Sequence, residues 1–220
     1  MVNFQHNGKQ RVFFTSDLHL NHQQDFVWKS RGYNSFEDHR NKVIESINND
    51  VGINDVLFCL GDGWLNTTID AFHNDIDAIK CQNIYMLWGN HPNPHYKNVY
   101  IPLVKSILGS NYINGMELYP IRYKNIIYIG NYAEITVNGI CVILSHYPHY
   151  VWNYMQKGAF HLTGHSHYGC PLSKLDSPHG RILDVGWDGH GKVWAWDELY
   201  DVLSKKEIVA MDHHKPEVNK

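Results

Sequence analysis

Short apolar runs alternate with helix-like segments along the first half of the chain. The apolar run at residues 12–14 predicts a buried strand over 11–15, and residues 35–50 repeat apolar positions along one helical face. Ser35 and Asp38 resemble a capping box at the start of that helix. The pattern continues through a strand, a helix and a strand at residues 55–62, 67–80 and 83–91. This order favours parallel strands with helices packed outside the sheet.

The second half of the chain is richer in strand patterns. Asn138 and Gly139 separate two apolar runs, 125–137 and 140–146, and this dipeptide is a strong signal for a type I′ hairpin. We therefore expect antiparallel pairing in this half. The remaining predicted elements are a helix at 101–108, strands at 161–163, 181–185 and 192–196, a helix at 197–205 and a loose tail at about 207–220.

The composition fits one domain over residues 1–220. With 43% hydrophobic and 19% charged residues, a chain of 220 residues can bury a sizeable core. The net charge of −3 argues against strong binding to duplex nucleic acid, which depends on many cations. No apolar run reaches the length of about 18 residues that a membrane span needs, and residues 1–10 lack a signal-peptide pattern. We therefore expect a cytoplasmic protein with reduced cysteines and no membrane partner.

Polar segments follow five of the apolar runs at the point where each run ends. These segments are Ser16–His19, Gly61–Asp62, Gly89–His91, Ser145–His146 and Gly164–His167. Because the carboxyl ends of parallel strands meet at one edge of a sheet, we expect a shared site there. In an extended chain residues i and i+2 point to the same side, so Asp17 and His19 can reach one ion, as can His165 and His167. Glycines at positions 61, 89 and 164 would let the backbone approach that ion closely.

Taken in order, these segments resemble the five sequence blocks of the calcineurin-like metallophosphoesterase superfamily. They extend from Asp17 to His167, and the closing segment 183–199 resembles the end of small bacterial and phage members of that superfamily. The resemblance implies a fold of the α/β (α+β) class. It implies a four-layer α-β-β-α sandwich with two mixed sheets, and a two-metal site at the carboxyl ends of the strands.

The resemblance also implies which residues bind each ion. Asp62 would bridge the two ions, and His91 would face the substrate. One ion would be held by Asp17, His19, Asp62 and His167, and the other by Asp62, Asn90, His146 and His165. Two positions depart from the family pattern, because Leu65 and Pro92 stand where polar or acidic residues are common. The departure at position 92 bears on how His91 is oriented, and it removes no ligand.

The chemistry of these residues is consistent with two divalent ions. Two ions carry four positive charges, whereas Asp17, Asp62 and a bridging hydroxide supply three negative ones, so the site would suit a phosphate anion. Mixed nitrogen and oxygen ligands suit manganese, our first choice, or iron, zinc or nickel. Such ions lower the pKa of bound water to about 7. A pair of them can also hold the attacking oxygen and the phosphoryl oxygens during an in-line displacement. Asp62 and Asn90 would thus serve catalysis as ligands, and His91 is a candidate general acid.

The substrate is less constrained than the metal site. We expect a phosphodiesterase that acts on a nucleotide, a cyclic nucleotide or a nucleic-acid end, because aromatic residues near the five segments could stack on bases. A phosphomonoesterase acting on a nucleotide or a phosphoprotein is an alternative. A non-catalytic scaffold of the same fold is another, although a scaffold has no need of a complete ligand set. The candidate substrate contacts are His22, Trp64, His149 and Tyr168.

Overall fold

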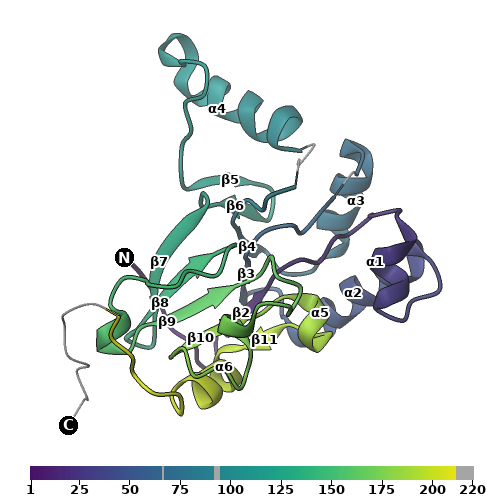
Figure 1. Cartoon of the computed structure of the whole chain (residues 1–220). Coiled ribbons are helices and arrows are strands. Elements are labelled where there is room, and N and C mark those ends of the chain that lie inside the picture. Colours follow the sequence, from purple (N-terminus) through teal and green to yellow (C-terminus); the bar gives the residue numbers. More distant parts are fainter. Residues whose placement is uncertain (66, 92–94, 212–220) are drawn as a thin grey trace.

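Two mixed β-sheets form the centre of the molecule in the computed structural model, which describes residues 1–65, 67–91 and 95–211 (Figure 1). The first sheet contains β2 (Val12–Thr15), β3 (Val56–Cys59), β4 (Asn83–Met86), β5 (Ile121–Tyr123), β6 (Ile126–Tyr128) and β11 (Trp194–Ala195), in the order β11-β2-β3-β4-β6-β5. The second contains β1 (Val2–Phe4), β7 (Tyr132–Val137), β8 (Ile140–Ser145), β9 (Phe160–Thr163) and β10 (Ile182–Asp184), in the order β1-β7-β8-β9-β10. The expected pair of mixed sheets is therefore present.

The helices predicted at 35–50, 67–80, 101–108 and 197–205 all form. The described helices are α1 (Asp25–Ser30), α2 (Phe36–Asp50), α3 (Ile69–Ala78), α4 (Ile101–Leu108), α5 (Trp187–His190) and α6 (Trp196–Leu203). Ser35 caps α2, because its side chain accepts a hydrogen bond from the Asp38 N–H at 3.1 Å. The Asp38 carboxylate accepts from the backbone N–H of Asn34, one residue earlier than a capping box requires.

The six-stranded sheet has a parallel centre, as the alternating pattern predicts. Val12 of β2 pairs with Val56 of β3, which in turn pairs with Asn83 of β4, and all three strands run in the same direction. The edge strands β5 and β11 are antiparallel to their neighbours. Because β2, β3 and β4 end at the same edge of the sheet, the polar segments that follow them emerge side by side.

The five-stranded sheet confirms the predicted hairpin and corrects the pairing around it. Asn138 and Gly139 have φ values of 49° and 84°, and they join the antiparallel strands β7 and β8. However, β8, β9 and β10 pair in parallel, so the expectation of mainly antiparallel pairing was wrong for this sheet beyond the hairpin. In the six-stranded sheet, β5 and β6 of the same half of the chain do pair antiparallel. The long connections 146–159 and 164–181 carry the chain back before each next strand, as parallel pairing requires.

The apolar run at 125–137 is divided between the two sheets. Its first part forms β6 in the six-stranded sheet, and its second part forms β7 in the five-stranded sheet. Gly130 lies between them with a φ of +94°, and its carbonyl accepts a hydrogen bond from the Trp88 N–H at 3.0 Å. The conformation of this glycine allows the chain to leave one sheet for the other, which apolar periodicity does not reveal.

Apolar cores lie on both faces of the six-stranded sheet. Phe14 and Phe58 stack at 5.1 Å between the two sheets, in a core that also includes Leu144 of β8. On the other face, α2 and α3 cover the sheet with residues such as Ile47 and Phe72. The outer face of the five-stranded sheet is covered within the described residues by a loop and short turn carrying Trp152 and Met155, which replaces the expected outer helical layer.

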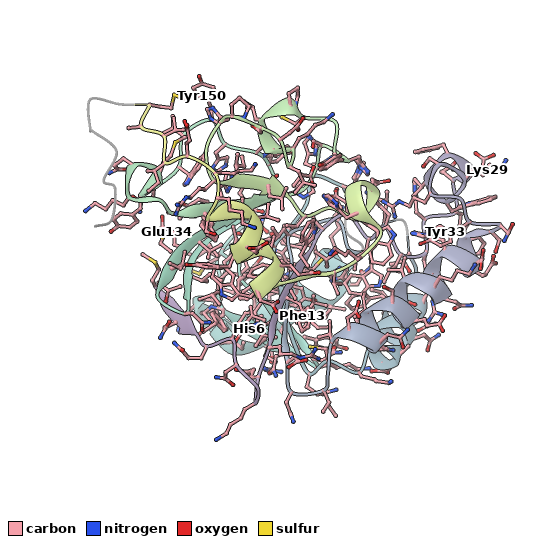
Figure 2. All side chains as sticks on the ribbon, turned by 90° about the horizontal axis from the view of Figure 1, so that it is seen from below. His6, Phe13, Lys29, Tyr33, Glu134 and Tyr150 are labelled. Atoms are coloured by element: carbon pink, nitrogen blue, oxygen red, sulfur yellow. The ribbon has the colours of Figure 1, made fainter. Side chains whose placement is uncertain are left out.

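Figure 2 shows the density of side chains around Phe13 at the centre of the molecule, with Lys29 and Tyr150 towards opposite ends. Among the described residues, no helix is long and apolar enough to cross a membrane. The expected loose tail is described only as far as Met211, because residues 212–220 lie outside the described part of the chain.

Candidate metal centre

The loops after β2 and β3 are joined to each other by backbone hydrogen bonds. The Asp17 N–H donates to the Gly61 carbonyl and the His19 N–H donates to the Asp62 carbonyl, both at 3.0 Å. The polar residues of the first two segments are therefore held in a fixed relation by main-chain contacts, which do not depend on any ligand.

Five of the seven predicted metal ligands gather in two overlapping groups. The ligand atoms of Asp17, His19 and His167 lie within 4.8 Å of one another, and so do those of Asp17, Asp62 and His146. Both groups could hold a metal ion, since carboxylate oxygens and imidazole nitrogens are ordinary ligands. Asp17 belongs to both groups in this geometry, whereas the family pattern gives the shared position to Asp62.

Asn90 and His165 extend the second group. The Asn90 Oδ1 atom lies 2.8 Å from His146 Nε2 and 2.8 Å from His165 Nδ1. The structure thus brings the amide of the third segment beside the imidazoles of the fourth and fifth. All seven predicted ligands form one continuous cluster.

The surroundings of His146 suit a cation. His146 Nδ1 lies 2.9 Å from the Leu60 carbonyl, an acceptor to which it can donate its proton. That tautomer turns the lone pair of Nε2 towards Asn90 Oδ1 at 2.8 Å and Asp62 Oδ2 at 3.3 Å, so acceptor atoms face one another. Burial disfavours a charged His146, but the Asp62 and Asp17 carboxylates and the Leu60 carbonyl together outweigh that effect and raise the pKa of His146. A metal ion would take the place of the second proton.

Buried polar atoms without hydrogen-bond partners lie at the first group. They are Asp17 Oδ1 and both ring nitrogens of His19, whose residues are 0% and 2% exposed. Burial raises the pKa of Asp17 to about 6, and burial with the nearby Arg31 lowers that of His19 to about 3. A cation would satisfy these atoms and restore the charged form of Asp17, while His19 is already in the neutral form that binds metals. The residues present therefore fit a metal ion.

The backbone of the site is strained, and it corrects one step of the sequence argument. Residues with positive φ are Asp17 (55°), His19 (49°), Asp62 (48°), His165 (64°) and His167 (48°). Such left-handed conformations cost roughly 1–3 kcal/mol each for residues with a Cβ, and they gather at functional sites. The spacing argument from an extended chain was therefore wrong, because sharp turns rather than strand alternation bring these side chains together.

The three glycines that the sequence singles out each permit a close approach. A Cβ atom on Gly61 would lie 2.5 Å from His146 Nδ1. A Cβ atom on Gly89 would lie 1.8 Å from Asp62 Oδ1, and one on Gly164 would lie 2.3 Å from Asp17 Oδ2. No side chain fits at these distances. The carboxylates of both groups consequently pack directly against main chain.

Asp188 and Arg31, which the sequence analysis did not single out, form hydrogen bonds that support the metal ligands. The His167 Nδ1 atom lies 2.7 Å from Asp188 Oδ2, and Arg31 binds the same carboxylate at 2.6 and 2.9 Å. Arg31 also donates to the carbonyls of Asp17 and Leu18, and its side chain is 4% exposed. The hydrogen bond that His167 donates to Asp188 raises the pKa of His167. The same hydrogen bond and the Arg31 guanidinium outweigh burial and hold the pKa of Asp188 well below its usual range. Paired carboxylates of this kind orient metal-binding histidines.

His91 lies at the open side of the cluster. Its backbone N–H donates to Asp62 Oδ1 at 3.3 Å, and its Nε2 is 3.8 Å from Asp62 Oδ2. The side chain is 41% exposed, so a substrate can reach it. Of the two positions that depart from the family pattern, Leu65 is 5% exposed, and Pro92 lies outside the described residues.

Of the predicted substrate contacts, His22 lies next to the cluster, whereas Trp64 lies in the core. The His22 ring lies 5.9 Å from the His19 ring, next to the first group, and burial lowers the pKa of His22. Trp64 is 2% exposed, and its Nε1 donates to the buried Asp75 carboxylate at 2.9 Å. Trp64 is therefore a core residue, and the expectation that it contacts a substrate was wrong.

His149 and Tyr168 also have structural partners. His149 Nε2 lies 3.2 Å from Ser145 Oγ, and its ring stacks with that of Tyr132. The hydroxyl of Tyr168 accepts a hydrogen bond from the Leu175 N–H at 3.2 Å. These contacts account for both side chains within the protein, so their assignment to the substrate gains no support.

The chain has relatives of similar length and a solved structure of similar fold. It is 25% identical over 208 residues to the Gene 66 protein of Mycobacterium phage L5, covering 88% of this chain and 94% of that protein. It is 27% identical over 217 residues to the Gene 66 protein of Mycobacterium phage D29, covering 90% and 95%. None of the family models compared matches the chain.

Among solved structures, the chain resembles the protein of unknown function AQ665 from Aquifex aeolicus, with a TM-score of 0.56, 16% identity, and coverage of 88% of this chain and 99% of that one. At this identity the likeness extends to the fold alone. A second structure, a predicted phosphoesterase from Streptococcus pneumoniae, matches with a TM-score of 0.32 and 15% identity over 80% of this chain and 71% of that one, which is too weak to carry an argument.

Proposed function

We propose that the chain is a metal-dependent hydrolase of phosphate esters, of the calcineurin-like metallophosphoesterase type. The observation that carries the proposal is the convergence of carboxylates and imidazoles at the strand ends, with buried atoms of Asp17 and His19 that lack partners. Strained left-handed turns at these same residues support a site built for function rather than for stability.

The proposal includes two ions, with manganese the first choice. One ion would be held by Asp17, His19, Asp62 and His167, and the other by Asp62, Asn90, His146 and His165, with Asp62 as the shared ligand. Asp17 lies within reach of both groups. The seven ligands combine imidazole nitrogen with carboxylate and amide oxygen, a mixture that suits manganese, iron, zinc or nickel. When bound, such ions lower the pKa of water and stabilise the negative charge of a phosphoryl group.

Among the protein's own groups, His91 would act on the leaving group. In hydrolysis, a water oxygen forms a new bond to phosphorus while the bond from phosphorus to the alcohol oxygen breaks. His91 is placed to give a proton to that leaving oxygen, because it is exposed beside Asp62. The hydrogen bond from the His91 N–H to Asp62 Oδ1 ties the acid to a ligand of the site.

For the substrate, we propose a phosphodiester that carries a nucleoside. Tyr147 supports this choice, since its ring lies 4.4 Å from the His165 ring and its side chain is exposed beside the cluster. Exposed aromatic faces bind bases by stacking. A phosphomonoester is the alternative, and the comparison of paired substrates below separates the two.

The test uses manganese-loaded protein with bis(p-nitrophenyl) phosphate as the diester and p-nitrophenyl phosphate as the monoester. We expect release of p-nitrophenol from the diester by the wild type, with loss in Asn90→Ala and His146→Ala. His73→Ala is the matched control, because His73 lies on α3 and its ring is hydrogen-bonded to the Tyr123 hydroxyl of β5 rather than to a residue of the cluster. Hydrolysis of neither ester, or equal activity in all four proteins, would overturn the proposal.

A further inference from the structure

Phe26 is an exposed aromatic residue close to the candidate metal centre. It lies in α1 and its side chain is 65% exposed, whereas its neighbour Val27 packs into the protein at 7%. In Figure 1, α1 lies beside α2, at the side of the molecule where α5 is also found. A single exposed apolar side chain is common on protein surfaces, so its meaning depends on what it contacts.

Phe26 is connected to the cluster through His22. The Phe26 ring meets the His22 ring edge to face, with centroids 5.6 Å apart, and the His22 ring is 5.9 Å from that of His19. The His91 ring also contacts the His19 ring, at 5.7 Å. Thus His22 and His91 both adjoin His19, and Phe26 is one ring contact further out.

We infer that His22 and Phe26 form a subsite for the base of the leaving nucleoside. The inference rests on the proposed function and deepens it, because it assigns a substrate group to one side of the site. His91 is placed to protonate the leaving oxygen, so the group attached to that oxygen extends towards the surface next to His91. The exposed ring of Phe26 lies on the same side of His19 as His22, whose imidazole contacts both Phe26 and His19.

The chemistry of the subsite favours a base over a second phosphate. The cations of the α1 region are already paired, Lys29 with Asp25 at 2.7 Å and Arg31 with Asp188 at 2.6 Å. A phenyl ring offers a stacking face that every base can use, and such stacking is sequence-tolerant. His22 has a buried Nδ1 without a partner in the structure, so its ring has hydrogen-bonding capacity to spare. We therefore assign the subsite to a dinucleotide-type diester rather than to a long polyanionic strand.

The experiment compares dinucleotides that differ in the leaving base alone. The probes are deoxyadenylyl-deoxyadenosine and its two analogues in which one or the other nucleoside is an abasic tetrahydrofuran sugar. The identity of the released nucleoside shows which side leaves. We measure kcat/KM for each probe with manganese-loaded protein, and the Kd of the matching methylphosphonates, which are not hydrolysed, by calorimetry.

We expect the wild type to prefer the probe with a leaving base by about tenfold, and Phe26→Ala and Phe26→Leu to lose that preference. Phe26→Trp restores it, because indole keeps a stacking face. Tyr200→Ala is the control, since Tyr200 is an exposed aromatic residue of α6 that packs beside Trp196. A manganese affinity equal to that of the wild type, measured by calorimetry, shows that the cluster is intact in each variant.

The outcomes separate the subsite from the proposed function. An active wild type without base preference, or a preference that survives in Phe26→Ala, would overturn the subsite and leave the phosphoesterase standing. If the protein hydrolyses no ester, the proposed function fails. The methylphosphonate affinities then decide the subsite, which is contradicted by equal Kd values for the complete and abasic compounds.

Discussion

The Nδ1 atom of His167 lies 2.7 Å from Oδ2 of Asp188, and the same carboxylate binds the buried guanidinium of Arg31. This arrangement fixes the Nδ1 proton of His167, so that its Nε2 atom is the nitrogen available to the group of Asp17 and His19. Arg31 in turn donates to the Asp17 carbonyl at 2.8 Å. One buried cation thereby ties the first and the last ligand segments together.

Replacement of Asp188 should weaken metal binding. We expect Asp188→Asn to reduce manganese affinity by about 10–100-fold, because the weaker acceptor no longer orients His167 and leaves Arg31 without its charge partner. Calorimetric titration with manganese measures the change. Asp201→Asn, which removes an exposed partner of Lys205, serves as the control. Equal affinities in the two variants would show that Asp188 does not support the site.

The role of His91 is tested by the leaving group. His91→Ala should slow hydrolysis of a diester with a poor leaving group, such as methyl thymidine 5′-phosphate, by about 10²–10⁴-fold. A p-nitrophenolate leaving group needs no proton, so its release should change little. The ratio of the two kcat/KM values is the measurement. A loss of the same size for both substrates would remove the general-acid assignment.

The close packing at Gly89 predicts that replacing it with alanine lowers the stability of the folded state. A Cβ at this position would lie 1.8 Å from Asp62 Oδ1 and 2.6 Å from the Asp62 nitrogen, so the backbone or the ligand must move. We expect Gly89→Ala to lower the free energy of unfolding by at least about 3 kcal/mol, measured by urea denaturation. In Gly8→Ala the new Cβ meets nothing within 4 Å, and its change should stay within about 0.5 kcal/mol. Similar values for both variants would refute the predicted crowding.

His161 makes stability depend on pH. It lies in β9 and is fully buried, with Nδ1 at 3.1 Å from the Ile143 carbonyl of β8 and Nε2 accepting from the His149 N–H at 3.0 Å. Burial lowers its pKa from 6.5 to about 3. Below pH 6.5 the unfolded chain gains a proton that the folded residue does not take up until about pH 3, so the folded state loses stability as the pH falls through this range.

We therefore expect His161→Gln to flatten the pH dependence of unfolding between pH 6 and pH 4. The slope should decrease by up to about 1.4 kcal/mol per pH unit, in urea titrations of protein kept free of metal by a chelator. His73→Gln, at a half-buried position on α3, is the comparison. An unchanged slope in His161→Gln would contradict the attribution of this pH dependence to buried His161.

Local patterns predicted the elements that build the site and did not predict how they meet. Apolar runs located β2, β3 and β4, and Asn138-Gly139 located the β7–β8 hairpin. The parallel pairing of β8 with β9 depends on how a long connection crosses the sheet, and the short strands β1 and β5 carry little periodicity. These features arise from tertiary packing, which no window of sequence contains.

The same limit applies to individual side chains. The ordered polar segments identified the seven clustered residues, because each follows a strand end. Arg31 and Asp188 were missed, since they meet across 157 positions of sequence. Trp64 was misassigned for a related reason, because its position next to Gly61–Asp62 suggested exposure, whereas Asp75 of α3 holds it in the core. Proximity along the chain does not give the direction of a side chain.

Anomalous diffraction from crystals of the manganese-loaded protein tests the metal centre most directly. We expect two anomalous peaks, one among Asp17, His19 and His167 and the other among Asp62, Asn90, His146 and His165, with the second peak lost in His146→Ala. The absence of any peak at these residues, or peaks that persist unchanged in His146→Ala, would contradict the assignment of this cluster as a two-metal site.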